Sequence, residues 1–464
     1  MQTRYLAELN DKRLLKRGNS ILNRLFSNSV HSIRRLAATE SEAKAIYRFL
    51  QNDNVTETDI IRNMSANCRS SLRGRPVLCI QDSSEINLYR HSNRIKRDDY
   101  VGVTNASETG WGFFIHPSFV IDAESFIPYG FSDVKVWNRP HQTQKDRSHA
   151  KNMAPIQEKE SYKWIESSIN SKKTLAEARH VIIIQDREGD IYEQFCMIPD
   201  EHTDLLIRAK TNRVLRDQSR LFEHLANCPK KGDYQITLEG DARKGVKKRT
   251  ANIEVRFSEV TISSNQYNDK SLPASKDLYA IEAREVTEGI ENPIVWRLLT
   301  TLTVEDFDTA LLCIEWYTCR WIIEEVFRIL KKEGFNIEAS ELSQGKAIRK
   351  LCLLMLETII KLFLMQIAYA LPEGQHMNPG NCFCENEIDC MEQQMTELEG
   401  KTEKQKNPYT QNDLRRYIWV IARLGGWKGY QSQRKPGITT FWIGLQKLTA
   451  IMQGWMLFRN VSKR

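Results

Sequence analysis

The segment Tyr317-Thr-Cys-Arg320-Trp321-Ile-Ile-Glu324-Glu325-Val-Phe-Arg328-Ile-Leu-Lys331-Lys332 combines a polar and an apolar face at helical spacing. On one continuous α-helix, an arc of roughly 60° would carry four polar side chains: Tyr317, Arg320, Glu324 and Lys331. Apolar residues fill the opposite side. The pattern predicts a helix that buries one face and holds a carboxylate between two cations and a phenol on the other. A core helix with a solvated charged face is the alternative interpretation.

Two short apolar segments end on the same dipeptide. Val77-Leu-Cys-Ile-Gln-Asp82 and Val181-Ile-Ile-Ile-Gln-Asp186 are too short for helices and rich in β-branched residues. They are therefore predicted as buried strands with an Asp at or just past the carboxyl end. Open α/β sheets place their chemistry at that edge. A helix packed beside these strands would bring Glu324 next to Asp82 and Asp186.

Three converging carboxylates have a specific chemical meaning. They repel one another and raise their own pKa values unless cations bind, so a trio of Asp82, Asp186 and Glu324 implies a divalent metal site. Two such ions, about 4 Å apart, activate a water molecule and stabilise the leaving oxygen of a phosphodiester. The sequence thus predicts metal-dependent phosphoryl transfer.

The spacing Tyr317-x2-Arg320-x3-Glu324-x6-Lys331 resembles the Y-R-E-K signature of the "insertion sequence four" group of bacterial DDE transposases. Asp82, Asp186 and Glu324 match the D-D-E triad of that group. The resemblance extends through most of the chain and includes Tyr47-Arg48-Phe49, Gln81-Asp82-Ser83, Asp186-Arg187-Glu188-x-Asp190, Glu158-Lys159-Glu160-Ser161-x-Lys163-Trp164 and Ile421-Ala422-Arg423-Leu424-Gly425-Gly426.

The resemblance implies an α/β fold with a ribonuclease-H-like (retroviral-integrase-like) catalytic core, flanked by helical N- and C-terminal domains. Residues 1–60 would form a helical DNA-end-binding domain, 61–365 the catalytic domain and 366–464 a helical dimerisation domain. Alternating apolar patterns at about 230–300 predict a β-rich insertion within the catalytic domain. The implied activity is cut-and-paste transposition by strand cleavage, hairpin formation and resolution, and strand transfer.

The same resemblance implies the cofactor and the partners. Asp82, Asp186 and Glu324 would hold two Mg²⁺ ions per active site, with Mn²⁺ as a substitute. The partners would be double-stranded DNA, both the terminal inverted repeats of the transposon and the target, and a second copy of the chain in a synaptic complex. Tyr317, Arg320 and Lys331 would hold the 5′ phosphate, Arg as a planar fork and Lys as a point charge.

Several further residues are candidates for contact with DNA. Trp296 is by default a core residue, but the resemblance implies that it receives a base flipped out of the DNA stack. Leu205 to Lys210 is predicted as a strand that places Arg208 and Lys210 on one face, as phosphate ligands. Arg13 and Arg17 lie in a basic first helix, where either a phosphate-facing role or a solvated face explains them. Glu188 and Asp190 are either supporting carboxylates or helix caps. A cationic stretch from Asn138 to Lys151 could follow a DNA backbone.

Composition is consistent with a nucleic-acid partner. The chain has 464 residues, of which 27% are charged, and a formal net charge of +8, which suits a polyanion. Most of the ten cysteines sit in apolar runs, but Cys382, Cys384 and Cys390 lie in a polar segment and are candidate zinc ligands. No signal peptide is expected. The apolar stretch from Leu351 to Leu371 contains Glu357 and Lys361, which favours a buried helix over a membrane span. We therefore expect a bacterial cytoplasmic protein associated with the nucleoid, with no membrane partner.

Two other functions compete with transposition. A hydrolytic nuclease would share the same core and lack strand transfer, and an assay for joining of donor ends to target DNA separates the two. A catalytically silent DNA-binding inhibitor of transposition would bind DNA or form inactive dimers without cutting. The intact set of Asp82, Asp186 and Glu324 argues against a silent site.

Overall fold

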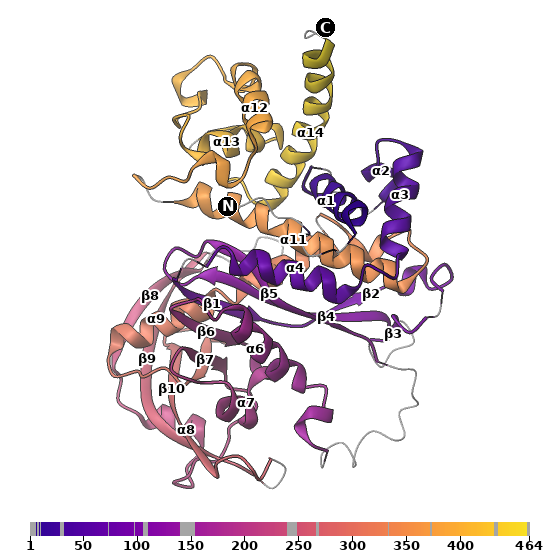
Figure 1. The fold of residues 1–464 in the computed structure, drawn as a ribbon. Helices are drawn as coiled ribbons and strands as arrows, with labels where there is room; N and C mark the ends of the chain where they lie inside the picture. Colours follow the sequence, from indigo (N-terminus) through magenta and orange to yellow (C-terminus); the bar gives the residue numbers. More distant parts are fainter. Residues whose placement is uncertain are drawn as a thin grey trace.

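The computed structural model describes the chain except residues 1–5, 7, 8, 10, 28–31, 73, 97, 105–109, 140–153, 239–247, 266–268, 333, 372, 373, 431–434 and 462–464, and the side chains of 26, 27, 35 and 456–461. Most of the cationic stretch from Asn138 to Lys151 therefore lies outside the described residues. The fold is mixed α/β: eleven described strands form one sheet, with helices on both of its faces and a helical region beyond one of them (Figure 1).

Parallel strands form the centre of the sheet. β1 (Pro76–Gln81) pairs in parallel with β6 (His180–Gln185), which pairs in parallel with β7 (Thr203–Arg208). On the other side of β1 lies β4 (Trp111–Asp122), antiparallel to it, and β5 (Pro128–Trp137) pairs with the far edge of β4. Both predicted strands that end on Gln-Asp are thus confirmed, and they are neighbours.

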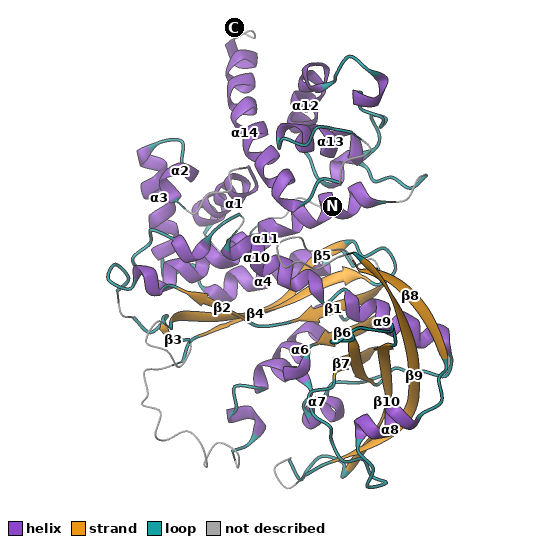
Figure 2. Cartoon of the chain, turned by 180° about the vertical axis from the view of Figure 1, so that it is seen from behind, coloured by secondary structure: helices purple, strands orange, loops and turns teal. Residues whose placement is uncertain are grey.

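The central strands are buried on both faces, which explains their nearly continuous apolar sequences. Along β1, Leu78 and Ile80 join one apolar cluster, whereas Val77 and Cys79 join a second cluster. The two clusters are the two faces of the sheet, because successive side chains of a strand point in opposite directions. Helices α4 (Glu57–Arg69), α10 (Trp321–Lys331) and α11 (Gly345–Ala370) cover the first face (Figure 2).

The second face is covered by shorter helices. α6 (Tyr162–Thr174) and α7 (Tyr192–Met197) contribute Ile165, Tyr192 and Phe195 to the second cluster. α8 (Leu221–Asn227) lies farther along the same face and adds Leu221 and Leu225.

The strand that carries Asp82 is interrupted at that residue. β2 (Ser84–Asn87) pairs with the same strand, β4, and continues the register of β1, since Gln81 lies opposite Ser118 and Ser84 opposite Ile115. The two intervening positions face His116 and Pro117. Because proline has no backbone N–H, the ladder cannot be completed there. The short β3 (Gly102–Val103) pairs with the beginning of β4.

The predicted β-rich insertion consists of four strands: β8 (Gly232–Leu238), β9 (Arg249–Ser263), β10 (Ser275–Glu285) and β11 (Val295–Thr300). They form an antiparallel meander, and β11 pairs with β7. The insertion therefore extends the catalytic sheet instead of forming a separate body. Its pairing also covers the edge that β7 would otherwise expose.

The predicted single helix from Tyr317 to Lys332 is wrong in one respect: it is two helices. α9 (Phe307–Thr318) ends and α10 begins at Trp321. At the junction the backbone bonds span three residues, with Arg320 N–H bonded to the Tyr317 carbonyl at 3.0 Å and Ile323 N–H to the Arg320 carbonyl at 3.2 Å. Cys319 and Arg320 keep right-handed helical backbone angles, so the junction is a short, tightened turn between the two helices.

Helix α11 runs through the middle of the molecule, between the sheet and the outer helices. It packs against α1 (Lys12–Ser27), α3 (Glu40–Gln51), α4, α10 and β5, and also against the two helices α13 (Leu414–Leu424) and α14 (Ile438–Val461). By length and composition alone it is the one described helix that could cross a membrane, but 83% of its most apolar window is buried inside the protein. Burial within the fold accounts for its apolar sequence.

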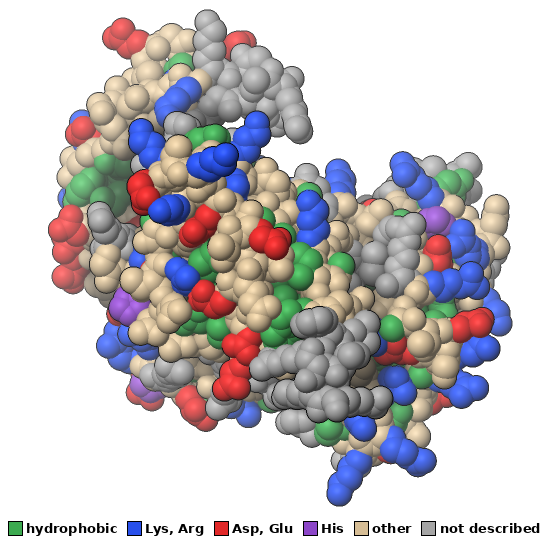
Figure 3. All heavy atoms as spheres, turned by 90° about the horizontal axis from the view of Figure 1, so that it is seen from above, with side chains coloured by type: hydrophobic (Ala, Val, Ile, Leu, Met, Phe, Trp, Pro, Cys, Tyr) green, Lys and Arg blue, Asp and Glu red, His purple; other side chains and the backbone are tan. Residues whose placement is uncertain are grey.

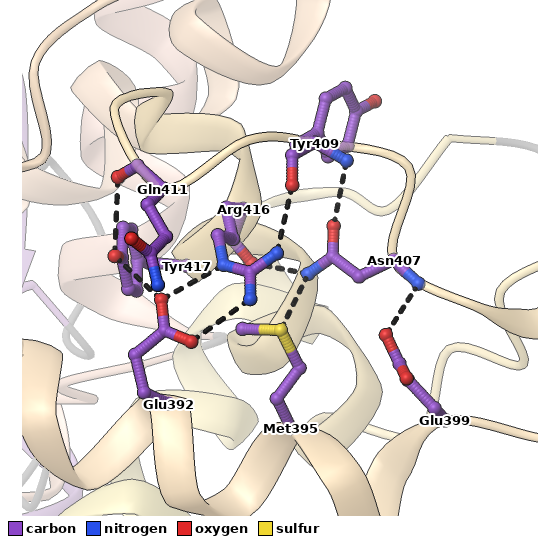
Figure 4. Close-up of polar contacts among 8 residues, drawn as sticks. All are labelled: Glu392, Met395, Glu399, Asn407, Tyr409, Gln411, Arg416 and Tyr417. Atoms are coloured by element: carbon purple, nitrogen blue, oxygen red, sulfur yellow. Dashed lines mark hydrogen bonds and ion pairs between the residues drawn. The ribbon is translucent and has the colours of Figure 1, made fainter.

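Capping and polar contacts hold the remaining helices. Thr39 caps α3, and Thr56 with Asp59 forms a capping box on α4. In the C-terminal region, Arg416 of α13 makes two hydrogen bonds of 2.9 Å to Glu392 of α12 (Glu385–Leu398) (Figure 4). Helices α12, α13 and α14 form the C-terminal region, and α14 projects away from the rest of the molecule (Figure 1). Short helices complete the described part: α2 (Ile33–Leu36), η1 (Tyr89–His91), η3 (Ile156–Glu158), η4 (Arg187–Gly189), η6 (Ile337–Ala339), η7 (Pro379–Asn381) and η8 (Glu403–Gln405).

Candidate active site

The three predicted carboxylates lie at one edge of the sheet. Asp82 directly follows β1 and Asp186 directly follows β6, and the preceding residues, Gln81 and Gln185, are partners in the parallel register. By strand alternation both aspartates point to the face that α9 and α10 cover. Glu324 lies in the first turn of α10. The helix junction thus delivers Glu324 to the edge where the two strands end.

Arg320 connects two of these carboxylates. Its Nη1 lies 3.3 Å from Asp82 Oδ2 and its Nη2 lies 2.6 Å from Glu324 Oε1. The guanidinium is largely buried, with 12% of the side chain exposed. Burial alone would lower its pKa, but the hydrogen bond to Glu324 and the surrounding negative charges raise the pKa of Arg320. Arg320 is therefore a permanent cation between Asp82 and Glu324.

Tyr317 connects the third carboxylate to the same network. Its hydroxyl donates to Asp186 Oδ1 at 3.0 Å. The ring is buried and meets the ring of Trp296 edge-on, with 5.8 Å between centroids. Burial, together with the negative charge of Asp186, raises the pKa of Tyr317. The phenol therefore remains protonated and acts as a hydrogen-bond donor.

Asp82 is the most electrostatically perturbed member of the trio. Burial raises its pKa to about 6, and the charges of Asp186 and Glu324 push in the same direction. The Ser83 N–H, which donates at 2.7 Å, and Arg320 oppose this shift without cancelling it. A buried carboxyl with a raised pKa gains strongly when a cation is brought next to it.

The donor chemistry of the trio fits a hard divalent cation, because Asp and Glu oxygens are its preferred ligands. Within the described residues, however, no three His, Cys, Asp or Glu side chains are gathered closely enough to hold an ion. The physical reason at this site is that the Arg320 guanidinium occupies the position between Asp82 and Glu324. The Arg320 guanidinium thus takes the place that a metal ion would occupy between Asp82 and Glu324. Cys382, Cys384 and Cys390, the zinc candidates from the sequence, are likewise not gathered into such a group in the described structure.

Two of the predicted DNA contacts lie beside the trio. Trp296 is on β11 and is half-buried against Tyr317. Arg208 ends β7, one position beyond the pairing of Gln185 with Ile207, so it is level with Asp186. Its positive charge reaches Tyr317, on which it has a pKa-lowering effect. The structure thus places Trp296 and Arg208 next to Tyr317 and Asp186.

Lys210 lies in a loop that Asp190 holds. The carboxylate of Asp190 accepts the Lys210 N–H at 2.8 Å and pairs with Arg213, and its side chain is completely buried. Lys210 itself is exposed. These contacts favour the interpretation of Asp190 as a supporting carboxylate over that of a helix cap. Asp190 supports the basic loop that contains Lys210 and Arg213. Glu188 is exposed and pairs with the buried Lys163 at 3.3 Å.

Lys331 is the last residue of α10 and lies apart from the contacts that Tyr317 and Arg320 make. Burial lowers its pKa, and the acidic groups that act on it are Glu338 and Glu85. In the described structure it is not part of the hydrogen-bond network of Arg320 and Tyr317. Distance along the helix is the reason, because Lys331 lies two turns beyond Glu324 on α10, about 10 Å of helix rise away. Lys331 lies at the β2 and η6 side of the site.

Arg13 and Arg17 belong to α1, far from the sheet edge along the chain. The first turn of α1 has no acidic residue, and 94% of the Arg13 side chain is exposed. In Figure 3, Lys and Arg side chains gather on the right-hand side of the molecule, which is the side where Figure 1 places α2 and α3. A basic surface separate from the carboxylate site suits a polyanion that extends beyond the active site.

Sequence reasoning missed two features of the site. Trp321, the first residue of α10, is 59% exposed although it is a large aromatic residue next to Arg320. One indication of this exposure is present in the sequence: in the segment from Tyr317 to Lys332, Trp321 lies at the border between the polar and the apolar face. The repeated Gln-Asp dipeptide was also visible, but nothing in a single sequence shows that the two glutamines meet.

Comparison with known proteins agrees with this geometry. Residues 4–55 match the family described as transposase DNA-binding, and residues 169–358 match the transposase DDE domain. The DDE domain implies a ribonuclease-H-like fold, which the mixed sheet is compatible with. The matched ranges contain Arg13, Arg17, Asp186 and Glu324.

A solved structure also resembles the chain weakly. It is described as a cryo-EM structure of the piggyBac transposase synaptic complex with hairpin DNA, and the alignment covers 96% of this chain and 72% of that chain, with 9% identity and a TM-score of 0.33. Similarity at that score is too low to establish a relationship. The two family matches are more specific: the chain contains a transposase DNA-binding domain at residues 4–55 and a transposase DDE domain at residues 169–358, which together support a DDE transposase.

Proposed function

We propose that this protein is a cut-and-paste transposase of the "insertion sequence four" group, whose best-known member is the transposon five transposase. It would act as a homodimer on transposon ends and target DNA in the bacterial cytoplasm. The observation that carries the proposal is the joining of Asp82 and Asp186, at adjacent strand ends, to Glu324 through the side chains of Arg320 and Tyr317.

Asp82, Asp186 and Glu324 would hold the divalent metal, for which Mg²⁺ is the proposed ion. When bound, the metal would supply an activated oxygen nucleophile and stabilisation of the leaving oxygen. Asp82 must lose its proton to serve as a ligand, which its pKa of about 6 allows at neutral pH. Arg320 would give up its bridge between Asp82 and Glu324 and turn its planar fork to a DNA phosphate, which is the other anion that it binds in two-point geometry.

The neighbouring side chains would orient the DNA. Tyr317, kept protonated, would hold Asp186 in place through its hydroxyl while its ring supports Trp296. Trp296 would stack on a base displaced during hairpin formation, which offsets the cost of unstacking. Arg208, Lys210 and Lys331 would contact phosphates near the cleavage point, and Arg13 and Arg17 would contact the transposon end. Strand cleavage, hairpin opening and joining to target are all phosphoryl transfers, so one site would serve them all.

The test compares two adjacent glutamates. Glu324 faces Arg320, whereas Glu325 pairs with Arg328 at 2.6 Å on another side of the same helix. We expect Glu324→Ala to abolish cleavage of DNA that bears the element's inverted repeats, in Mg²⁺ or Mn²⁺, and to leave DNA binding intact. Glu325→Ala should cleave and form hairpin-ended fragments like the wild-type protein.

The outcomes separate the competing functions. Cleavage by Glu324→Ala would falsify the proposed triad. A wild-type protein that binds the repeats and cuts nothing would support the silent inhibitor. Cleavage without joining to target DNA would support a nuclease.

A further inference from the structure

A chain of buried amides lies directly beneath the carboxylate site. Gln185 Nε2 donates to Gln81 Oε1 at 2.6 Å, and Gln194 Nε2 donates to Gln185 Oε1 at 2.8 Å. All three glutamine side chains are fully buried. The hydroxyl of Ser168, on α6, lies 3.2 to 3.3 Å from an amide atom of each of them. The amide chain, defined as Gln81, Gln185, Gln194 and Ser168, thus connects β1, β6, α7 and α6.

Its place in the sheet links it to the aspartates. Gln81 and Gln185 form the last pair in the parallel register of β1 and β6, and Asp82 and Asp186 come next. By alternation the glutamines point to the α6 face and the aspartates to the α9–α10 face. Beyond this pair the described ladder between β1 and β6 ends, so the amide contact is the last lateral connection before the two carboxylates.

The loop that carries Asp186 rests on the same amide. A Cβ added to Gly189, in η4, would lie 2.2 Å from Gln185 Oε1. Only a glycine therefore allows η4 to pack this closely on the Gln185 side chain. The conformation of the segment just after Asp186 is consequently tied to the position of that amide.

Packing alone does not require amides at these positions. Cys79, Ile183 and Ile207, on the same face, are fully buried and belong to the apolar cluster. Gln81 Nε2 and Gln194 Oε1 are buried without a hydrogen-bond partner among the described residues, so the amides carry a cost that hydrocarbon side chains would avoid. The bonds that the chain does make are directional and select one arrangement more strictly than hydrocarbon contacts do. The sequence thus places directional groups where apolar ones would pack, one residue before each aspartate.

We propose that the amide chain is a positioning element that sets the separation and orientation of Asp82 and Asp186, with Gln185 as its central residue. This inference rests on the proposed function, because it assigns these aspartates to a divalent cation. Gln185 does not touch the cation or the DNA. It acts through the backbone that it shares with Asp186 and through its bond to Gln81.

The experiment measures metal binding directly, by electron paramagnetic resonance titration of the full-length protein with Mn²⁺. Asp82→Asn defines the signal that depends on the site. We expect Gln185→Leu to weaken the Asp82-dependent Mn²⁺ affinity at least tenfold, and Ser168→Ala to weaken it about threefold. The matched control is Ser171→Ala, which removes a buried hydrogen bond to Ser132, 2.9 Å long, one turn farther along α6. Its Mn²⁺ affinity should equal that of the wild-type protein.

The results have distinct consequences. Wild-type affinity in Gln185→Leu would overturn the inference, as would the absence of Asp82-dependent Mn²⁺ binding in the wild-type protein. If Gln185→Leu fails to fold, as judged by circular dichroism, the Mn²⁺ affinities of Ser168→Ala and Ser171→Ala are compared instead. Equal affinities in these two variants would overturn the inference. If Mn²⁺ binding depends on Gln185 in a protein that cuts no DNA, the inference stands and the proposed transposition fails.

Discussion

Tyr317 donates its hydroxyl hydrogen to Asp186 across 131 positions of sequence, at 3.0 Å. Hydrogen bonds to charged groups contribute about 1.5 to 3 kcal/mol, so Tyr317→Phe should slow single-turnover DNA cleavage by about tenfold or more. Tyr129→Phe is the matched control, because Tyr129 makes the same kind of bond, 2.7 Å long, to Asp122 elsewhere in the fold. Equal cleavage rates for the two variants would contradict the role of Tyr317.

In the proposed active state the planar fork of Arg320, released from Asp82 and Glu324, binds a DNA phosphate at two points, which an ammonium group cannot do in the same geometry. We therefore expect Arg320→Lys to lower cleavage by about a hundredfold at saturating metal while DNA binding changes little. Gel-shift binding and single-turnover cleavage on the same DNA separate the two effects. Arg328→Lys, which alters the pair with Glu325, should behave as wild type.

Cleavage should depend on pH through Asp82. Since burial raises its pKa to about 6, the carboxyl is protonated below that value and ionised above it. A cation must displace the proton at low pH, so cleavage at limiting Mn²⁺ should fall about tenfold per unit below pH 6 and level off above it. The rate should be measured from pH 5 to 8 at constant ionic strength. A flat profile across that range would count against Asp82 as a metal ligand.

The same shift predicts a cost to stability. The folded state holds the Asp82 proton more tightly than the unfolded state, so stability without metal declines as pH rises from the unfolded value toward 6. At neutral pH without metal, Asp82→Asn should raise the free energy of unfolding by about 1 kcal/mol. For Asp122, burial is outweighed by hydrogen bonds from Tyr129 and Ser125, which lower its pKa, so Asp122→Asn should destabilise. Urea denaturation of both variants tests whether the free energy of unfolding changes in opposite directions. A stabilised Asp122→Asn would refute the prediction.

Binding of the transposon end should be electrostatic. Replacing Arg13 and Arg17 together by Ala should weaken binding and reduce the slope of log affinity against log salt concentration by about 2, one for each phosphate that the variant no longer neutralises. Cleavage chemistry on DNA already bound should not change. Replacing Arg179 and Lys270, two exposed residues outside the matched DNA-binding range, provides a comparison with the same loss of charge. An unchanged slope in the Arg13 and Arg17 variant would show that these side chains face solvent.

Much of the site was predictable because its parts are local. An apolar run of four or five residues that ends in Asp specifies a buried strand and its reactive end, and it did so at both Asp82 and Asp186. Glu324 could be predicted as a site residue from its spacing to Arg320. The insertion strands followed from alternation, although their pairing with β7 depends on a distant edge that one sequence does not reveal.

The remaining features depend on geometry between distant segments. The break between α9 and α10 has no proline or glycine to announce it, since the residues are Thr318, Cys319 and Arg320. Arg320, at the break, lies between Asp82 and Glu324, whereas Lys331, two turns beyond Glu324 on α10, lies near Glu85. The contact between Gln81 and Gln185 needs the register of two strands that lie 104 residues apart.

Helix α11 has a consequence for shortened forms of the protein. Because α1, α3, α13 and α14 all pack on it, a product that starts downstream of the first helices would leave a strip of hydrocarbon open to water along a helix that is otherwise enclosed. We expect such a product to bury this apolar strip against a second polypeptide. Proteolysis or internal translation starts would thus change what the protein associates with, in addition to removing its basic end.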